Sequence, residues 1–267
     1  MIIRLLKNEI IKMIHSKKNY VLISCLTFMI LAIVYIIFMN QKNIIADMPQ
    51  IRKLNPQLKN DILNMNSVIF LRQFCTEFVF RPVVPYFIFF MVVVSVELFG
   101  EDFFSGNMKF FINIDKKRIN LFIAKVLSLF VYSLFIVILN IVLGFIISSI
   151  FFNVSFNGLF RIILIYLSSI IPVVSFALII GLISMYVQNK KLSLVIGIGS
   201  SIFLTVADRL TLTSKFSPIG ILGIMDKIRP MNIQFNNLLW SNITSLIYLI
   251  VFYFIGIYIF RNKEFNY

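Results

Sequence analysis

Charged side chains are scarce in this sequence. Only 13% of its 267 residues are Asp, Glu, Lys or Arg, whereas 60% are apolar, and the mean hydropathy is +0.94. A soluble domain carries about 25% charged residues, because its surface must be hydrated. The shortage of charge therefore excludes an ordinary soluble protein and predicts an integral membrane protein.

Residues that bind metals or form disulfides are also few. The chain has two cysteines, Cys25 and Cys75, and one histidine, His15. One cysteine falls in an apolar run and the other in a connecting segment, which favours packing residues over a redox or metal site. His15 has no cysteine and no second histidine near it in the sequence, so we expect no metal site. An intramembrane enzyme needs His, Glu or Asp clustered within its spans, and we therefore expect a protein that is not an enzyme.

Long apolar runs, in contrast, are abundant. A transmembrane helix needs about 20 mostly apolar residues to cross the hydrocarbon core. We predict an all-α integral membrane protein with a single transmembrane domain over residues 1–267. Four runs are long enough by themselves, whereas two reach span length only by including charged residues at their ends. The six predicted spans are 20–39, 82–100, 120–151, 162–187, 192–210 and 238–260, and the two weaker ones are the second and the fifth.

The distribution of Lys and Arg predicts which side each loop faces. Six spans place both termini on one side, and that side carries 14 of the basic residues against 11 on the other. Compact basic clusters at Lys17–Lys18, 116–118 and Lys190–Lys191 lie at span ends on the side of the termini, which predicts cytoplasmic termini. Residues 40–81 are then a long external loop, and 211–237 are a second external segment. The Ser67 to Phe80 stretch is either a helix on the outer interface or the beginning of a longer second span.

The net charge of +14 has a bearing on partners and on location. Because the basic residues occur on both faces of the membrane, they suit anionic lipid headgroups better than nucleic acid, and we expect membrane lipids and no nucleic acid as partners. The richness in Ile, Asn, Lys and Phe is typical of an AT-rich genome. We therefore expect a multi-pass protein of a bacterial plasma membrane.

The first 18 residues have the pattern of an amphipathic helix. Apolar side chains recur at helical spacing on one side, and basic or polar side chains lie between them. Such a helix is expected to lie in the membrane interface before the first span begins. The alternative is a charged lead-in that only orients the first span. The apolar stripe consists of Ile3, Leu6, Ile10, Met13 and Ile14.

The connection between the second and third spans is unusually dense in charge and phenylalanine. It reads GEDFFSGNMKFFINIDKKRINLFIAK, from Gly100 to Lys125. A helix over its first part would show a polar face with Glu101 and Lys109 and an aromatic face with Phe104 and Phe111. A helix of this kind lies flat under the membrane and offers its polar face to the cytoplasm. The alternative is a solvated loop with ordinary juxtamembrane charges.

This block resembles the segment joining the second and third spans of type-2 permease subunits of ATP-binding cassette (ABC) exporters. Glu101 matches the acidic residue of that class, and Gly106 with Asn107 matches its Gly-Thr pair. Arg118 and Lys125 match its basic residue and the Lys seven positions later. The sequence departs from the class pattern where Asn replaces Thr, where phenylalanines occupy places that are often charged, and where an acid stands in place of a frequent proline. The six spans, the N-terminal helix and the basic tail are similar to the class as well.

The resemblance implies a coupling helix after the second span, which docks on a separate ABC ATPase subunit. The chain has no G-x-x-x-x-G-K-[ST] loop to bind phosphates, so it needs no cofactor of its own, and ATP and Mg²⁺ are expected on that partner. A second permease subunit, identical or related, is implied as well. The residues assigned to ATPase coupling are Glu101, Asp102, Phe103, Phe104, Ser105, Gly106, Asn107 and Lys109, and those assigned to the cytoplasmic span boundary are Glu97, Arg118 and Lys125.

The resemblance also implies a function, namely export of amphipathic or hydrophobic substrates such as antimicrobial or cytolytic peptides or drugs. No residue is assigned to substrate binding. The competing hypothesis is a channel, a secondary transporter or an immunity protein that needs no ATPase. Against it, the sequence has no internal repeat of the kind secondary transporters have, and it lacks a line of ionisable residues within the spans.

Overall fold

The computed structural model describes residues 2–47, 56–74, 86–104, 115–187, 189–210, 216–217 and 235–262. Within these residues the chain is helical, and its β-structure is one isolated bridge between Asn66 and Asn153. The all-α class predicted from the sequence is therefore confirmed. The helices are α1 (Ile2–His15), α2 (Lys17–Asp47), α4 (Pro56–Leu63), α5 (Ser67–Gln73), α6 (Tyr86–Phe104), α8 (Asp115–Phe151), α9 (Leu159–Ser168), α10 (Ile170–Val187), α11 (Lys190–Leu210) and α13 (Phe235–Asn262).

Five helical segments in the described residues are long and apolar enough to cross a membrane. They are Lys17–Gln41, Arg118–Phe151, Leu159–Val187, Lys190–Ala207 and Leu239–Arg261. Each overlaps one predicted span, so a multi-pass membrane protein is supported. The remaining predicted span, 82–100, corresponds to α6, whose 19 residues include Glu97, Glu101 and Asp102 near the end. The count of six therefore stays a prediction.

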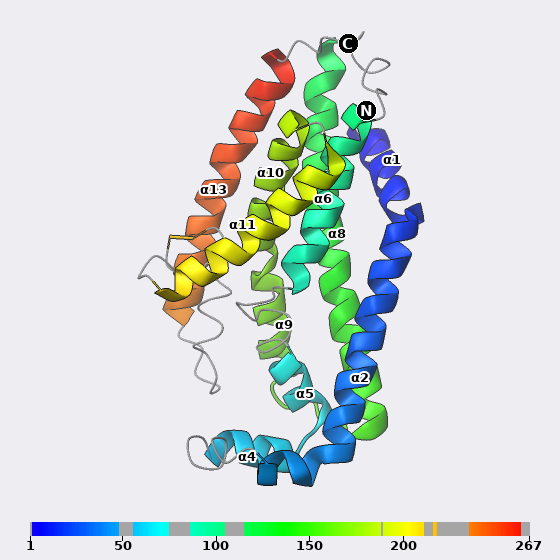
Figure 1. The fold of residues 1–267 in the computed structure, drawn as a ribbon, viewed down its shortest axis with the longest axis vertical. Coiled ribbons are helices and arrows are strands. Elements are labelled where there is room, and N and C mark those ends of the chain that lie inside the picture. The colour runs from blue at the N-terminus through cyan, green and yellow to red at the C-terminus, as the bar shows by residue number, and fades with distance from the viewer. Residues whose placement is uncertain are drawn as a thin grey trace.

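Helix α10 lies at the centre of the bundle, and the other long helices surround it (Figure 1). Thirteen of its 18 residues are buried, and its most extensive contact is with α6. The two helices approach closely because Gly181 leaves room for the Phe99 ring, and Ser95 Oγ donates a hydrogen bond to the Ala177 carbonyl. Small residues permit this close packing in membrane helices, where the hydrophobic effect does not drive association.

The long helices α2 and α8 run side by side on one side of the bundle, α13 forms the opposite side, and α11 crosses obliquely in front (Figure 1). Their outward faces carry large apolar side chains, such as Phe28, Phe203 and Phe254, each more than 60% exposed. Side chains of this kind are compatible with contact to lipid. The described ends of α1 and α13 lie at the same end of the molecule (Figure 1).

The predicted external loop at 40–81 contains helical structure. α2 continues through a kink at Asn40 to Asp47, and α4 and α5 follow. Asp61 and Arg72 form an ion pair between α4 and α5, and α5 packs against α8 and α9. The beginning of the Ser67 to Phe80 stretch is thus a separate short helix, α5, with Phe74 as its C-cap. Residues 75–85 lie outside the described part of the chain.

Candidate functional site: a charged cluster at the end of α6

The predicted coupling residues are only partly within the described chain. Glu101 to Phe104 form the last turn of α6, so the expected separate helix does not begin there. Glu101 is exposed, and Phe104 is half-buried and packs against the core. Ser105, Gly106, Asn107 and Lys109 lie outside the described residues, and their coupling role stays a prediction.

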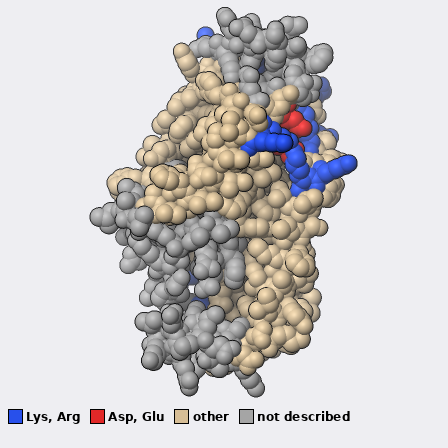
Figure 2. Space-filling model, in the orientation of Figure 1, with Lys and Arg blue, Asp and Glu red and all other residues tan. Residues whose placement is uncertain are grey.

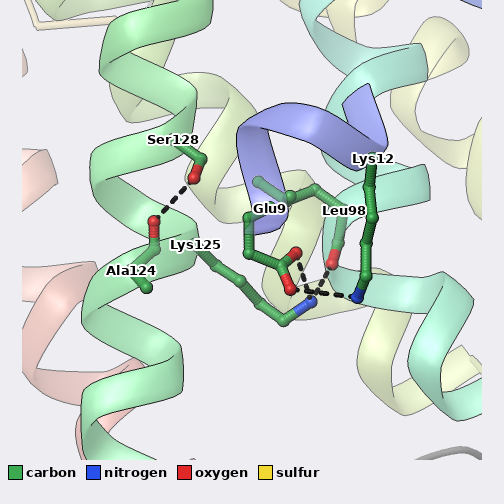
Figure 3. A network of polar contacts seen from close by, with 6 residues as sticks. All are labelled: Glu9, Lys12, Leu98, Ala124, Lys125 and Ser128. Atoms are coloured by element: carbon green, nitrogen blue, oxygen red, sulfur yellow. Dashed lines mark hydrogen bonds and ion pairs between the residues drawn. The ribbon is translucent and has the colours of Figure 1, made fainter. Parts of the chain in front are cut away.

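Lys125, which the sequence placed at the span boundary, is a buried residue. It lies on α8 with its side chain 1% exposed, and its ammonium contacts a Glu9 carboxylate oxygen at 3.4 Å. It also donates a hydrogen bond to the Leu98 carbonyl of α6 (Figure 3). Arg118, the preceding basic residue of the motif, is half-buried near the beginning of α8. Because a buried charge is costly without a partner, the position of Lys125 depends on these contacts.

Glu9 is the acidic residue that joins α1 to this site. Its side chain is 5% exposed, and it also pairs with Lys12 at 3.0 Å (Figure 3). The sequence analysis did not single it out, although Glu9 is the only acidic residue before Asp47. An isolated acid within a basic amphipathic segment is the signal that would have identified it.

The predicted apolar stripe of α1 is divided between the two sides of the helix: Met13 is buried, and Leu6 and Ile10 are half-buried. Glu9 and Met13 are the buried residues of the helix, whereas Ile3 and Ile14 of the predicted stripe are 79% and 44% exposed. Glu9 lies on the buried side because its carboxylate contacts the buried Lys125 of α8. The exposed isoleucines then face outward, where lipid would lie.

A second ion-pair group surrounds Glu97 on α6. Lys18 at the beginning of α2 binds its carboxylate at 2.7 Å, and Lys190 at the beginning of α11 lies 4.0 Å away. Ser16, between α1 and α2, donates a hydrogen bond to the same carboxylate at 3.3 Å. Glu97 was predicted as a boundary residue, and it lies where three helices meet. Lys18, Ser16 and Lys190 were not singled out individually, because nothing in a linear pattern shows that they share one acid.

The two ion-pair groups line one cleft, which we call the α6-end cleft. Its empty volume is about 440 Å³, including the part open to solvent. On the face shown in Figure 2, basic and acidic side chains gather at one end of the molecule, in the region where α1, α6 and α11 come together. The remaining described surface of this face is almost free of charge. The lining residues are Glu9, Lys12, Met13, Ser16, Lys18, Asn19, Leu22, Val94, Glu97, Leu98 and Glu101.

The charged side chains of the α6-end cleft form ion pairs that connect neighbouring helices. The carboxylates of Glu9 and Glu97 each have lysines beside them, so neither has the open coordination that a metal ion requires. Within the described part of the chain, no group of three His, Cys, Asp or Glu side chains has the arrangement of a metal site. Asn19 of α2 accepts a further hydrogen bond from the Tyr132 hydroxyl of α8 at 2.5 Å. The polar contacts thus join five helices, namely α1, α2, α6, α8 and α11, at one end of the bundle.

Comparisons with known proteins give a family and no activity. Residues 72–266, most of the chain, match a family described as "Protein of unknown function (DUF2705)". This match includes α6, α8 and α11 but begins after α1 and α2. No curated protein matches the sequence.

Proposed function

This chain belongs to the DUF2705 family, and we propose that it is the membrane-spanning subunit of an ABC exporter that works with a separate ATPase subunit. The observation that carries the proposal is the set of ion pairs around the end of α6. The residues of the predicted coupling segment continue directly from this end, which is held by Glu97 and by the Leu98 carbonyl. The family match itself contributes no function.

The proposal includes six spans, with α6 as the second. A 19-residue helix is about 28 Å long, close to the hydrocarbon thickness. Its three acids fall in its last eight residues, where they would reach the interface. Its burial supports this assignment, because most of its described residues are buried and it packs mainly against the predicted spans α10 and α11. An even number of spans also accounts for the shared end of α1 and α13 (Figure 1). Both termini are cytoplasmic in this proposal, and α1 lies at the inner interface.

The ion pairs supply a path for movement from the ATPase to the spans. When the partner closes on ATP and Mg²⁺, it displaces the segment at 101–109. The displacement moves α6, whose Leu98 carbonyl and Glu97 carboxylate are bound to other helices. Because packed helices shift as bodies, the movement reaches α8 through Lys125 and α11 through Lys190. A transport subunit requires such a connection between its cytoplasmic end and its substrate path.

The substrate path lies between two permease subunits, either two copies of this chain or two related chains. The cargo is amphipathic or hydrophobic, such as an antimicrobial or cytolytic peptide or a drug. Two features support this class: the helices outside the charged end are lined by apolar side chains, and the described chain forms no large soluble domain. The protein acts in the plasma membrane of a bacterium.

Co-purification with an ATPase tests the proposal. The tagged chain is purified from its native membrane in mild detergent, the associated proteins are identified by mass spectrometry, and ATPase activity is measured. Reversing both acids in Glu101→Lys/Asp102→Lys should abolish co-purification, because the polar face of the coupling segment changes sign. Arg161→Glu is the matched control, since Arg161 is an exposed charge on α9, a helix that lies away from the end of α6 (Figure 1). It should leave co-purification unchanged.

The proposal is overturned if the chain purifies without an ATPase, or if the charge reversal leaves both the ATPase and transport unaffected. Either result would favour an ATPase-independent channel, secondary transporter or immunity protein.

A further inference from the structure

The far end of the bundle carries a second cleft, which we call the α4–α5 cleft. It lies where the kink of α2, the junction of α4 and α5 and the end of α8 meet, away from the charged cluster (Figure 1). Its cavity volume is about 390 Å³, which is within the usual size of a ligand site. None of its described lining residues is charged. They are Phe38, Gln41, Leu63, Asn64, Met65, Asn66, Phe151, Phe152, Asn153, Val154 and Ser155.

Four of the five polar residues that the structure places in the lining of the α4–α5 cleft are carboxamides, and hydrogen bonds hold two of them, Gln41 and Asn66. Gln41 Nε2 donates to the carbonyls of Ile62 and Leu63, which leaves its Oε1 as an acceptor. Asn66 Oδ1 accepts from the Ile69 backbone at 2.8 Å and caps α5, which leaves its Nδ2 as a donor. The cleft therefore presents acceptors and donors side by side.

The walls of the cleft are fixed by contacts between distant parts of the chain. Asn66 and Asn153 form the isolated parallel bridge, and the Ser67 backbone N–H donates to the Asn153 carbonyl at 3.2 Å. The backbone N–H of Ser155 donates to Ser67 Oγ at 3.0 Å. Residues 153–155 thus form a short bridged segment beside the carboxamides.

The apolar part of the cleft comes from phenylalanine. The rings of Phe38 and Phe151 pack edge to face with their centroids 5.5 Å apart, and Phe38 and Phe152 do so at 6.2 Å. Phe38 is 44% exposed, so its ring is available to an apolar side chain of a ligand. A ligand that suits this lining has peptide-like hydrogen-bonding groups, apolar side chains and no charge, because a charge here would lose its hydration without a partner.

We propose that the α4–α5 cleft binds an uncharged segment of a peptide backbone, with the carboxamides of Asn64 and Asn153 bonded to peptide groups and an apolar side chain against Phe38. Peptide groups carry one donor and one acceptor each, as carboxamides do, so the two are complementary. The identification of this peptide with the exported cargo rests on the proposed function. Binding itself requires no ATPase.

Calorimetric titration of the purified full chain in nanodiscs, without any partner, tests the site. The probes are the capped tripeptide acetyl-Leu-Ala-Leu-amide, the same tripeptide with free charged ends, and maltotriose. The capped peptide should bind, the charged form should bind at least tenfold more weakly, and maltotriose should not bind. Asn64→Ala and Asn153→Ala should each weaken the capped peptide about three- to tenfold, the loss expected for one neutral hydrogen bond.

Two further variants make the test specific. Asn60→Ala, in α4 but outside the lining, is the matched control and should leave the affinity unchanged. Asn153→Asp should increase the affinity for the peptide with a free amino end and an amide-capped carboxyl end, because it places a negative charge in the cleft. Failure of the capped peptide to bind would overturn the proposal, as would binding unaffected by the lining variants or preferred binding of maltotriose. Because no ATPase is present, these outcomes are independent of the co-purification experiment.

Discussion

Two lysines contact the same Glu9 carboxylate from different environments. The Lys125 side chain is 1% exposed, whereas the Lys12 side chain is 49% exposed. An ion pair open to water contributes about 0–1 kcal/mol, because solvent screens it. Removing one partner of a buried pair costs about 3–5 kcal/mol, because the other charge is left buried. Substituting each lysine in turn therefore compares a buried ion pair with an exposed one at the same Glu9 carboxylate.

We expect Lys125→Met to lower the free energy of unfolding by about 3–5 kcal/mol and Lys12→Met by less than about 1 kcal/mol. The measurement is equilibrium unfolding of the purified chain in detergent. Adding Glu9→Leu to Lys125→Met should recover part of the loss, because it removes the unpaired carboxylate. Equal effects of the two lysine variants would show that Lys125 is not buried against Glu9.

Gly256 shows how a single residue sets the distance between two helices. A Cβ at this position of α13 would collide with the Phe122 ring of α8, which is fully buried and packs against Phe260 at a centroid distance of 5.0 Å. At Gly199 of α11, in contrast, an added Cβ would meet no atom within 4 Å. The ring of Phe122 has no free volume into which to move.

We expect Gly256→Ala to destabilise the protein by about 1–3 kcal/mol, the usual cost of overpacking. Gly199→Ala should be neutral or stabilise by up to about 1 kcal/mol, because alanine favours the helix. Melting temperatures of both variants in the same detergent check the prediction. If the two substitutions lowered the melting temperature equally, the contact between α13 and α8 would be contradicted.

At the scale of elements, α6 is the helix on which the others converge. Its outward acid, Glu97, is shared by the first residues of α2 and α11. Lys18 is 44% exposed and Glu97 is 19% exposed, so the pair contributes more to positioning than to overall stability. The contacts of Glu97 hold the ends of α2, α6 and α11 together.

Charge reversal tests this junction. Lys18→Glu should place two acids together and reduce transport, and Lys18→Glu/Glu97→Lys should restore it in part. Recovery should be larger with Lys190→Glu added, since Lys190 would otherwise face the new lysine. Transport by the full complex is the readout, with protein level in the membrane as the control for folding. If the double variant is as defective as Lys18→Glu, the two side chains do not act as a pair.

At the scale of the whole molecule, the number of spans decides where the termini lie. Six spans with α6 included place both termini on one side, whereas the other five segments alone place them on opposite sides. The shared end of α1 and α13 in Figure 1 favours the first arrangement. In the proposed orientation, with cytoplasmic termini, the charged cluster lies at the inner face and the α4–α5 cleft at the outer face.

Reporter fusions distinguish the two arrangements. We expect a fluorescent reporter at either terminus to be active in the cytoplasm, and a phosphatase inserted at the Asn157–Gly158 turn to be active outside. A fusion in the connection between α6 and α8 should report the cytoplasmic side. Opposite locations for the two termini would exclude six spans.

Long sequence patterns predicted the helices of this fold better than short ones did. Four long apolar runs and one that needs the charged residues at its end predicted the five candidate membrane segments, because burial of the backbone in lipid allows only helices there. α6 was the weakest case, since its acids fall inside the helix rather than after it. The α4 helix was missed, because a helix of eight residues carries too little periodicity to be recognised, whereas α5 falls in the stretch for which a separate helix was one of two alternatives.

The candidate site was predictable in part. The motif directed attention to Glu97, Glu101 and Lys125, and the structure brings Glu97 and Lys125 into the junction at the end of α6. It did not indicate that Lys125 would be buried or that Glu9, 116 residues earlier, would be its partner. Contacts between side chains so distant in sequence depend on helix packing, which no local spacing encodes.

The sequence by itself determined that this is a helical membrane protein, because the cost of unpaired backbone groups in lipid depends only on composition and run length. It also determined that α1 is a helix with an apolar and a basic side. Only the tertiary structure decided that Glu9 lies on the buried side of α1, since its partner Lys125 belongs to a distant helix. The tertiary structure likewise decided that carboxamides from α2, α5 and the end of α8 share one uncharged cleft, because only packing brings these segments together.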